Sequence, residues 1–154
     1  ERGAARAKAI MRRLSCGNDL IRDVNLLIRY HDQPLRPERV DLLRMMQRFA
    51  SGGVDVPRLM GELFDLKRAD TLGKASQCFY YVDEIERMRE MVRELIANGE
   101  AYSVKTLNLT GKDLIAHGMA PGPQVGAALN RALEGAIVGE VPNSTPHLLT
   151  YLGF

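Results

Sequence analysis

His31 and Asp32 are the residues whose types and order most directly suggest chemistry. An adjacent imidazole and carboxylate, joined by further His and Asp side chains, can hold a divalent metal ion for hydrolysis of a phosphate ester. Such a site needs several ligands, and the other two of the 3 histidines lie far along the chain. We therefore interpret His31 as a histidine at a helix C-terminus, favoured there by the helix dipole, and Asp32 as a turn residue. No metal ion is predicted.

A second candidate site is the turn Pro121-Gly122-Pro123, which opens a predicted helix. A helix N-terminus presents free N–H groups and partial positive charge, and both attract phosphate. Lys105, Lys112 and Arg131 lie nearby in the sequence, so Gly122 and these three cations are candidate contacts with an RNA backbone. The alternative is a rigid turn between helices, in which Gly126 permits close helix packing.

Helical periodicity dominates the part of the chain that precedes these candidates. We expect a helix over about residues 2–14, one from Asn18 to Tyr30 or His31, one from Pro37 through Phe49, and one from Pro57 to about Leu72 or Ala75. A long helix is expected from the Gln77 region to Asn98-Gly99. Asn18 and Asp55 are predicted to cap the second and fourth helices. The apolar side chains expected to face inward include Ala4, Ile10, Met11 and Leu14; Ile21, Val24, Leu27 and Ile28; Val40, Leu43, Met46 and Phe49; Leu59, Leu63 and Leu66; and Val82, Ile85, Met88, Val92, Leu95 and Ile96.

The last third begins with a β-branched stretch over residues 101–109 that is predicted to be extended. Thr110 is expected to cap a helix, with Asp113 as its return partner, and Gly118 to end it. A longer helix runs from Gly122-Pro123 to Gly139, and Asn143-Ser-Thr-Pro146 caps a short final one. We predict an all-α protein, with a multi-helix bundle over residues 1–99 followed by a small helical subdomain over residues 100–154.

Charge and composition narrow the class of partner. The net charge is only +2, but residues 1–50 carry 11 Lys and Arg against 6 Asp and Glu, so the basic excess lies there. Such an excess suits a polyanion such as RNA, and it is also typical of a solvated helix face. Cys16 and Cys78 have no metal-ligand spacing and are expected to be reduced thiols, which predicts a cytoplasmic setting. No run of about 18 apolar residues is present to span a membrane.

Two stretches resemble a known family. The order "NLTGKDLIAHGMAPGPQVGAALN" followed by "GEVPN" resembles the C-terminal end of bacterial tRNA nucleotidyltransferases, the CCA-adding enzymes and their poly(A) polymerase relatives. The order "VNLLIRYHD" followed by "LKRADTLGKA" resembles the later half of the HD-type helical domain in one branch of them. Asp70 falls where that pattern has its last acidic ligand. The ligands of the earlier helices have no counterpart here, and an ion pair between Asp70 and Lys74 is the alternative.

The resemblance implies a tRNA-holding part of a tRNA nucleotidyltransferase, and the opening Glu1-Arg2-Gly3 leads us to expect a fragment. In the family, a Gly-Ser turn and an Asp-x-Asp pair of an N-terminal catalytic domain hold Mg²⁺ for nucleotidyl transfer. Neither motif occurs here, so the fragment is expected to need no cofactor, to be inactive alone, and to have tRNA and that domain as partners. Two alternatives are a remnant of an HD-type metal-dependent phosphohydrolase and a purely structural helical interaction module.

Overall fold

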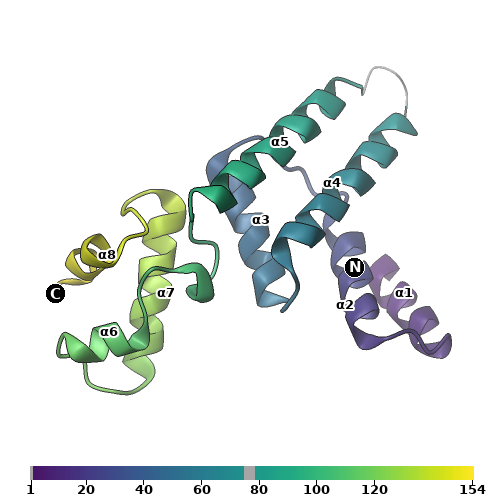
Figure 1. Cartoon of the computed structure of the whole chain (residues 1–154). Helices are drawn as coiled ribbons and strands as arrows, with labels where there is room; N and C mark the ends of the chain where they lie inside the picture. The colour runs from purple at the N-terminus through teal and green to yellow at the C-terminus, as the bar shows by residue number, and fades with distance from the viewer. Residues whose placement is uncertain (1, 75–78) are drawn as a thin grey trace. The chain divides into compact units, whose positions relative to one another are not determined.

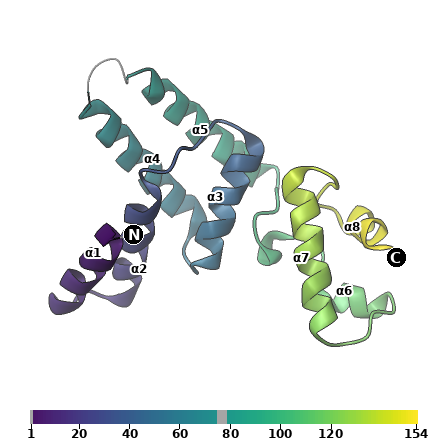
Figure 2. The same cartoon turned by 180° about the vertical axis from the view of Figure 1, so that it is seen from behind.

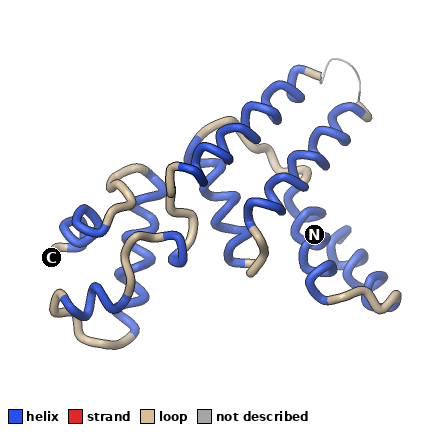
Figure 3. The backbone as a smooth tube through the Cα atoms, in the orientation of Figure 1, coloured by secondary structure: helices blue, strands red, loops and turns tan. Residues whose placement is uncertain are grey.

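The computed structural model describes residues 2–74 and 79–154, and the described residues are helical, with no strand among them (Figures 1 and 3). The chain divides into two compact units, Glu1–Glu94 and Leu95–Phe154. The all-α prediction is confirmed. No helix of the described residues is long and apolar enough to cross a membrane. Cys16 is a free, half-buried thiol, and Cys78 lies outside the described residues.

The first unit is built from α1 (Arg2–Arg13), α2 (Asn18–Tyr30), α3 (Arg39–Ser51), α4 (Val56–Leu72) and most of α5 (Tyr80–Ala97). Helices α1 and α2 form a hairpin, α2 and α3 both contact α4, and α4 and α5 run side by side (Figures 1 and 2). An ion pair between Arg89 and Asp65, with 2.7 Å between nitrogen and oxygen, joins α4 to α5. The side chains buried most completely are Leu42, Leu43, Met45, Met46, Phe49, Leu59, Met60, Leu63, Phe64, Ile85 and Met88.

The start of α4 follows a local signal, whereas the starts of α2 and α3 differ from the predictions. Asp55 caps α4 as predicted, because its carboxylate accepts the N–H of Arg58 at 3.1 Å. The prediction for Asn18 is wrong: Gly17 is the N-cap of α2, and no side chain caps that helix. Helix α3 begins at Arg39, two residues after Pro37, because Glu38 has the extended backbone of an N-cap.

Several inward positions were predicted wrongly. Ile10 and Leu14 are 44% and 67% exposed, because α1 contacts α2 along its small residues, with Ala4 buried. Val40 and Leu66 are also at the surface, and beside Leu66 it is Lys67 that turns inward. The apolar stripe of α5 is confirmed, since Ile85, Met88, Val92 and Leu95 are all buried.

The second unit contains the end of α5, the 3₁₀ turn η2 (Val104–Thr106), α6 (Gly111–Ala116), α7 (Pro123–Val138) and α8 (Thr145–Leu152). Helix α7 is central, since η2, α6 and α8 all contact it (Figure 2). The predicted box at α6 is confirmed: Thr110 accepts the Asp113 N–H, and the Asp113 carboxylate accepts the Thr110 N–H at 2.8 Å. Gly118 has the left-handed φ of 98° that ends this turn.

Side chains hold two loops of the second unit, and the first of these loops differs from the prediction. The stretch 101–109 is interrupted by η2, since the Thr106 hydroxyl accepts the N–H groups of Tyr102 and Ser103 at 3.0 Å. The predicted segment Asn143-Ser-Thr-Pro146 contains the N-cap of α8, which is Ser144, although no side chain caps that helix. Instead, the Asn143 amide donates to the carbonyls of Gly99 and Thr106 at 2.8 and 3.0 Å and accepts the N–H of Asn108 at 2.8 Å.

Candidate functional site

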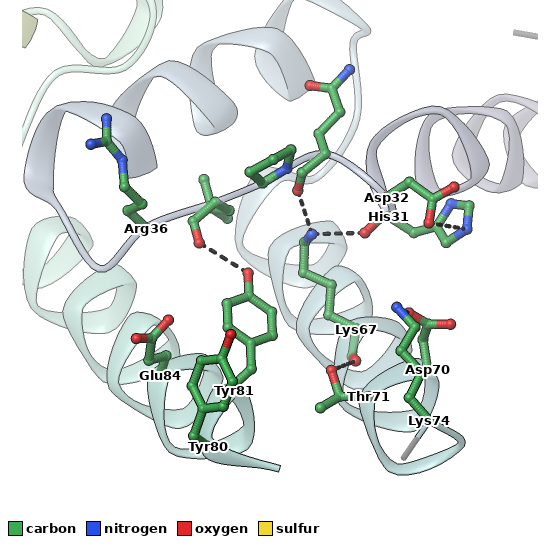
Figure 4. A pocket seen from close by; sticks show the side chains of 13 residues that line it. His31, Asp32, Arg36, Lys67, Asp70, Thr71, Lys74, Tyr80, Tyr81 and Glu84 are labelled. Atoms are coloured by element: carbon green, nitrogen blue, oxygen red, sulfur yellow. Dashed lines mark hydrogen bonds and ion pairs between the residues drawn. The ribbon is translucent and has the colours of Figure 1, made fainter. Parts of the chain in front are cut away.

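In the first unit, a cavity of about 360 Å³ lies where α2 ends against α4 and the start of α5 (Figure 4). His31 and Asp32, at the end of α2, line it together with Asp70 of α4. The structure therefore brings together the three residues that the sequence marks as candidate metal ligands. What each of them contacts decides what the cavity can bind.

Lys67 is the polar centre of this cavity. Its side chain enters from α4, the residue is only 4% exposed, and its ammonium donates to the backbone carbonyls of His31 and Gln33, both at 2.7 Å (Figure 4). Carbonyls at the end of a helix have no partner within the helix, so an inserted cation satisfies them and suits the helix dipole. Burial lowers the pKa of Lys67, while the charges of Asp32 and Asp70 oppose that shift.

The candidate ligands themselves have protein partners. His31 Nδ1 lies 2.8 Å from the carbonyl oxygen of Ile28 and must donate to it, while Nε2 lies 3.3 Å from Asp32 Oδ1. Asp70 Oδ2 lies 2.6 Å from Lys74 Nζ, and this contact lowers the pKa of Asp70. Within residues 2–74 and 79–154, no three His, Cys, Asp or Glu side chains are grouped to hold a metal ion. The contacts of Lys67 with the carbonyls of His31 and Gln33 brace the C-terminal end of α2.

In the second unit, the turn before α7 is built as predicted. Gly122 is the N-cap with φ of 147°, a conformation that favours glycine, and Pro123 is the first helical residue. The Gln124 side chain donates to the carbonyl of Ala120 at 2.6 Å, and the Val125 N–H donates to the Gly122 carbonyl at 3.1 Å. Since Pro123 has no N–H and Val125 is already engaged, this helix start offers few free donors to a phosphate.

The three predicted cations of this unit are exposed and lie on different elements: Lys105 on η2, Lys112 on α6 and Arg131 on α7. Both η2 and α6 pack against the helix that carries Arg131. The Arg131 guanidinium carbon lies 5.5 Å from the centre of the Tyr151 ring on α8, which holds this cation at the α7–α8 contact.

The role predicted for Gly126 is wrong. A β-carbon at this position would meet nothing within 4 Å, so no close packing depends on it. A β-carbon on Gly135 would lie 2.7 Å from the ring of Tyr151, and one on Gly111 would lie 2.9 Å from Val125. Close contact therefore occurs at Gly135, between α7 and α8, and at Gly111, between α6 and α7.

Sequence reasoning placed the basic excess in residues 1–50 but did not identify the groove that part of it lines. A groove of about 260 Å³ runs between α1 and α2, and Lys8, Arg12, Arg22 and Arg29 line it. Helix α1 contains five Lys and Arg residues and no acid. That composition was a usable signal, but only the pairing of α1 with α2 shows which of its cations share a groove.

Comparisons with known proteins relate the chain to tRNA nucleotidyltransferases. The family model described as "tRNA nucleotidyltransferase domain 2 putative" matches residues 3–152. A CCA-adding enzyme of Levilactobacillus brevis is 34% identical over 80 residues, which cover 52% of this chain and 20% of that protein. A CCA-adding enzyme of Lacticaseibacillus paracasei is 39% identical over 61 residues, which cover 40% of this chain and 15% of that protein.

Each match thus spans a fifth or less of the relative's length, and no solved structure matches the chain. The family model, in contrast, covers nearly all of this chain. On that match, the chain belongs to the tRNA nucleotidyltransferase domain 2 family.

Proposed function

We propose that this chain is the helical, tRNA-holding part of a protein that completes the 3′ end of tRNA by CCA addition. The family match over residues 3–152 carries the proposal, and the names of the two relatives support the choice of reaction. Nucleotidyl transfer needs a metal-binding carboxylate set, and the Asp-x-Asp pair implied for it does not occur in these 154 residues. We assign that chemistry, its Mg²⁺ and the selection of nucleotides to a catalytic domain of the same parent protein.

Holding tRNA requires cations spread over a rigid surface more than it requires base-specific groups. Folded RNA is recognised largely through its shape, its phosphates and its 2′-hydroxyls. Helix α1 has five cations and no acid, and α2 adds Arg29, whereas its Arg22 is paired with Asp19 and Asp23. This distribution supports contact with a polyanion, and a tRNA partner agrees with a cytoplasmic location.

The second unit supplies the other proposed contacts, Lys105, Lys112, Gly122 and Arg131. All three cations are exposed: Lys105 and Lys112 lie on short elements that pack against α7, and Arg131 lies on α7 itself. The box of Thr110 and Asp113 fixes the start of the helix that carries Lys112. These residues would act mainly through charge, because the start of α7 offers few free N–H groups. Their proposed partner is the tRNA backbone.

Fluorescence anisotropy with labelled tRNA tests the proposed function. The 154-residue chain is titrated from low to physiological salt, with duplex DNA of equal charge as the control. We expect binding that prefers tRNA, with a logarithmic salt slope of about −0.7 to −0.9 per phosphate contacted. Absence of tRNA binding at every salt concentration would refute the proposal and leave the structural interaction module as the better hypothesis, which a change of mass in size-exclusion chromatography without RNA would support.

A further inference from the structure

The groove between α1 and α2 has a mixed lining that suits a charged, elongated ligand. Ile21 belongs to its lining and is 6% exposed, while Lys8 and Arg12 of α1 and Arg29 of α2 contribute positive charge. Lys8, Arg12 and Arg29 are all exposed. The groove therefore exposes amine and guanidinium groups to solvent beside the apolar side chain of Ile21.

The sequence of α1 explains why these cations reach the groove. Positions four apart lie on one face of a helix, so Lys8 and Arg12 project together. Ala4 is buried in the contact with α2, and its carbonyl accepts the Asn25 side-chain N–H at 2.7 Å. A β-carbon on Gly3 would lie 3.6 Å from Ile28, which shows how near α1 comes to α2. Small residues thus fix α1 on α2 and place both cations beside the seam.

The cations of the groove differ in whether the protein already neutralises them. Arg22 is ion-paired with Asp19 at 3.1 Å and with Asp23 at 3.4 Å. Within the described residues, the side chains of Lys8, Arg12 and Arg29 make no ion pair or hydrogen bond. Like charges four apart, such as Lys8 and Arg12, disfavour a helix. Three uncompensated cations beside one groove are better explained by an anion bound from outside than by the stability of the hairpin.

We propose that the α1–α2 groove binds the phosphodiester backbone of RNA through Lys8, Arg12 and Arg29. This inference rests on the proposed tRNA-holding function and names a contact surface additional to Lys105, Lys112, Gly122 and Arg131. RNA is the partner of choice because a backbone repeats its charge along its length, as the cations do along the groove. Arg22 remains a structural residue, held by its two aspartates.

Two matched triple variants of the same chain test the proposal. The groove variant is Lys8→Ala, Arg12→Ala, Arg29→Ala, and the control is Arg2→Ala, Arg6→Ala, Arg13→Ala, which removes equal charge from exposed positions of α1 that do not line the groove. Alanine favours helix, so both variants should fold, and circular dichroism verifies this. For the groove variant we expect tRNA affinity at about 0.1 M salt to fall roughly a hundredfold and the salt slope to shrink by about 2.

The control variant should lose less than about fivefold in affinity, because it changes only the long-range field and no direct phosphate contact. Equal losses in the two variants, or no loss in the groove variant, would overturn the inference while leaving the proposed function intact. Failure of the unsubstituted chain to bind tRNA would instead overturn the proposed function and, with it, the RNA partner of the groove. An acidic protein captured by the groove in place of RNA also counts against the inference.

Discussion

Replacing Lys67 with Met should destabilise the first unit by removing the cation that closes the end of α2. The methionine keeps most of the apolar stem of a residue that is 4% exposed, so the substitution isolates the ammonium. Two carbonyls, those of His31 and Gln33, lose donors that lie 2.7 Å away. An acceptor left without its partner costs about 1–2 kcal/mol, so we expect a loss of about 2–4 kcal/mol in the free energy of unfolding.

Urea denaturation followed by circular dichroism measures this loss, with the midpoint reporting stability and the slope reporting the surface exposed. Lys74→Met is the matched control on the same segment of chain, because Lys74 is exposed and its ion pair with Asp70 lies at the surface. An exposed pair of this kind contributes about 0–1 kcal/mol. A loss for Lys67→Met no larger than that of the control would refute the bracing role.

The pH dependence provides a second check on the same residue. Burial lowers the pKa of Lys67 below its ordinary value of 10.5, so the unfolded state holds this proton more tightly than the folded state. Burying the ammonium is therefore unfavourable at every pH below the folded pKa, and this effect disappears as pH rises to the unfolded value. From neutral to alkaline pH, the stability of the unsubstituted chain should rise relative to Lys67→Met. A constant or falling difference would contradict the assignment.

Three further outcomes are expected. Gly135→Ala should reduce the stability of the second unit by about 1–3 kcal/mol in thermal unfolding, because its β-carbon would lie 2.7 Å from the Tyr151 ring. Gly126→Ala has open space around the new β-carbon and should raise stability by up to about 1 kcal/mol. Asn143→Ala breaks three loop hydrogen bonds and should cost about 2–3 kcal/mol, with hydrogen exchange increasing at Asn108. Hydrogen bonds from Thr110 lower the pKa of Asp113, so their stabilisation is present above the unfolded pKa and is lost as pH falls through the folded pKa. Asp113→Asn should abolish that acid-side change in thermal unfolding, and an unaltered pH profile would contradict it.

The parts of the fold that the sequence predicts are those set by neighbours in the chain. The 3.6-residue period identifies the helices, and Asp55 just before Pro57 identifies the cap of α4. Thr110 with Asp113 three residues later identifies the box of α6. The errors arise where a partner distant in sequence decides. Ile10 is exposed because α1 uses its small residues against α2. The bridge from the Asn143 side chain to Gly99, 44 residues earlier, was likewise not predicted.

The candidate sites also include features that neighbouring residues predict and features that depend on residues distant in the sequence. The chain order places His31 beside Asp32, and the turn at Gly122 follows from its own residues. The insertion of Lys67 beneath His31 spans 36 residues, so no local pattern predicts it. The basic composition of α1 is visible in the sequence, but the choice of Lys8 and Arg12 over its other cations depends on which face α2 covers.

The first unit has a buried cation, Lys67, and three exposed cations beside the α1–α2 groove, Lys8, Arg12 and Arg29. This difference in burial separates their roles. Lys67 is buried, donates to two carbonyls and has Asp32 and Asp70 as counter-charges. A divalent cation entering that cavity would meet the positive charges of Lys67 and Lys74 before two acids that they already compensate. Asp32 and Asp70 supply negative charge near this internal cation. Because that cation fixes the end of α2, it also fixes the helix from which Arg29 extends, so bracing inside the unit maintains the surface that we propose for RNA.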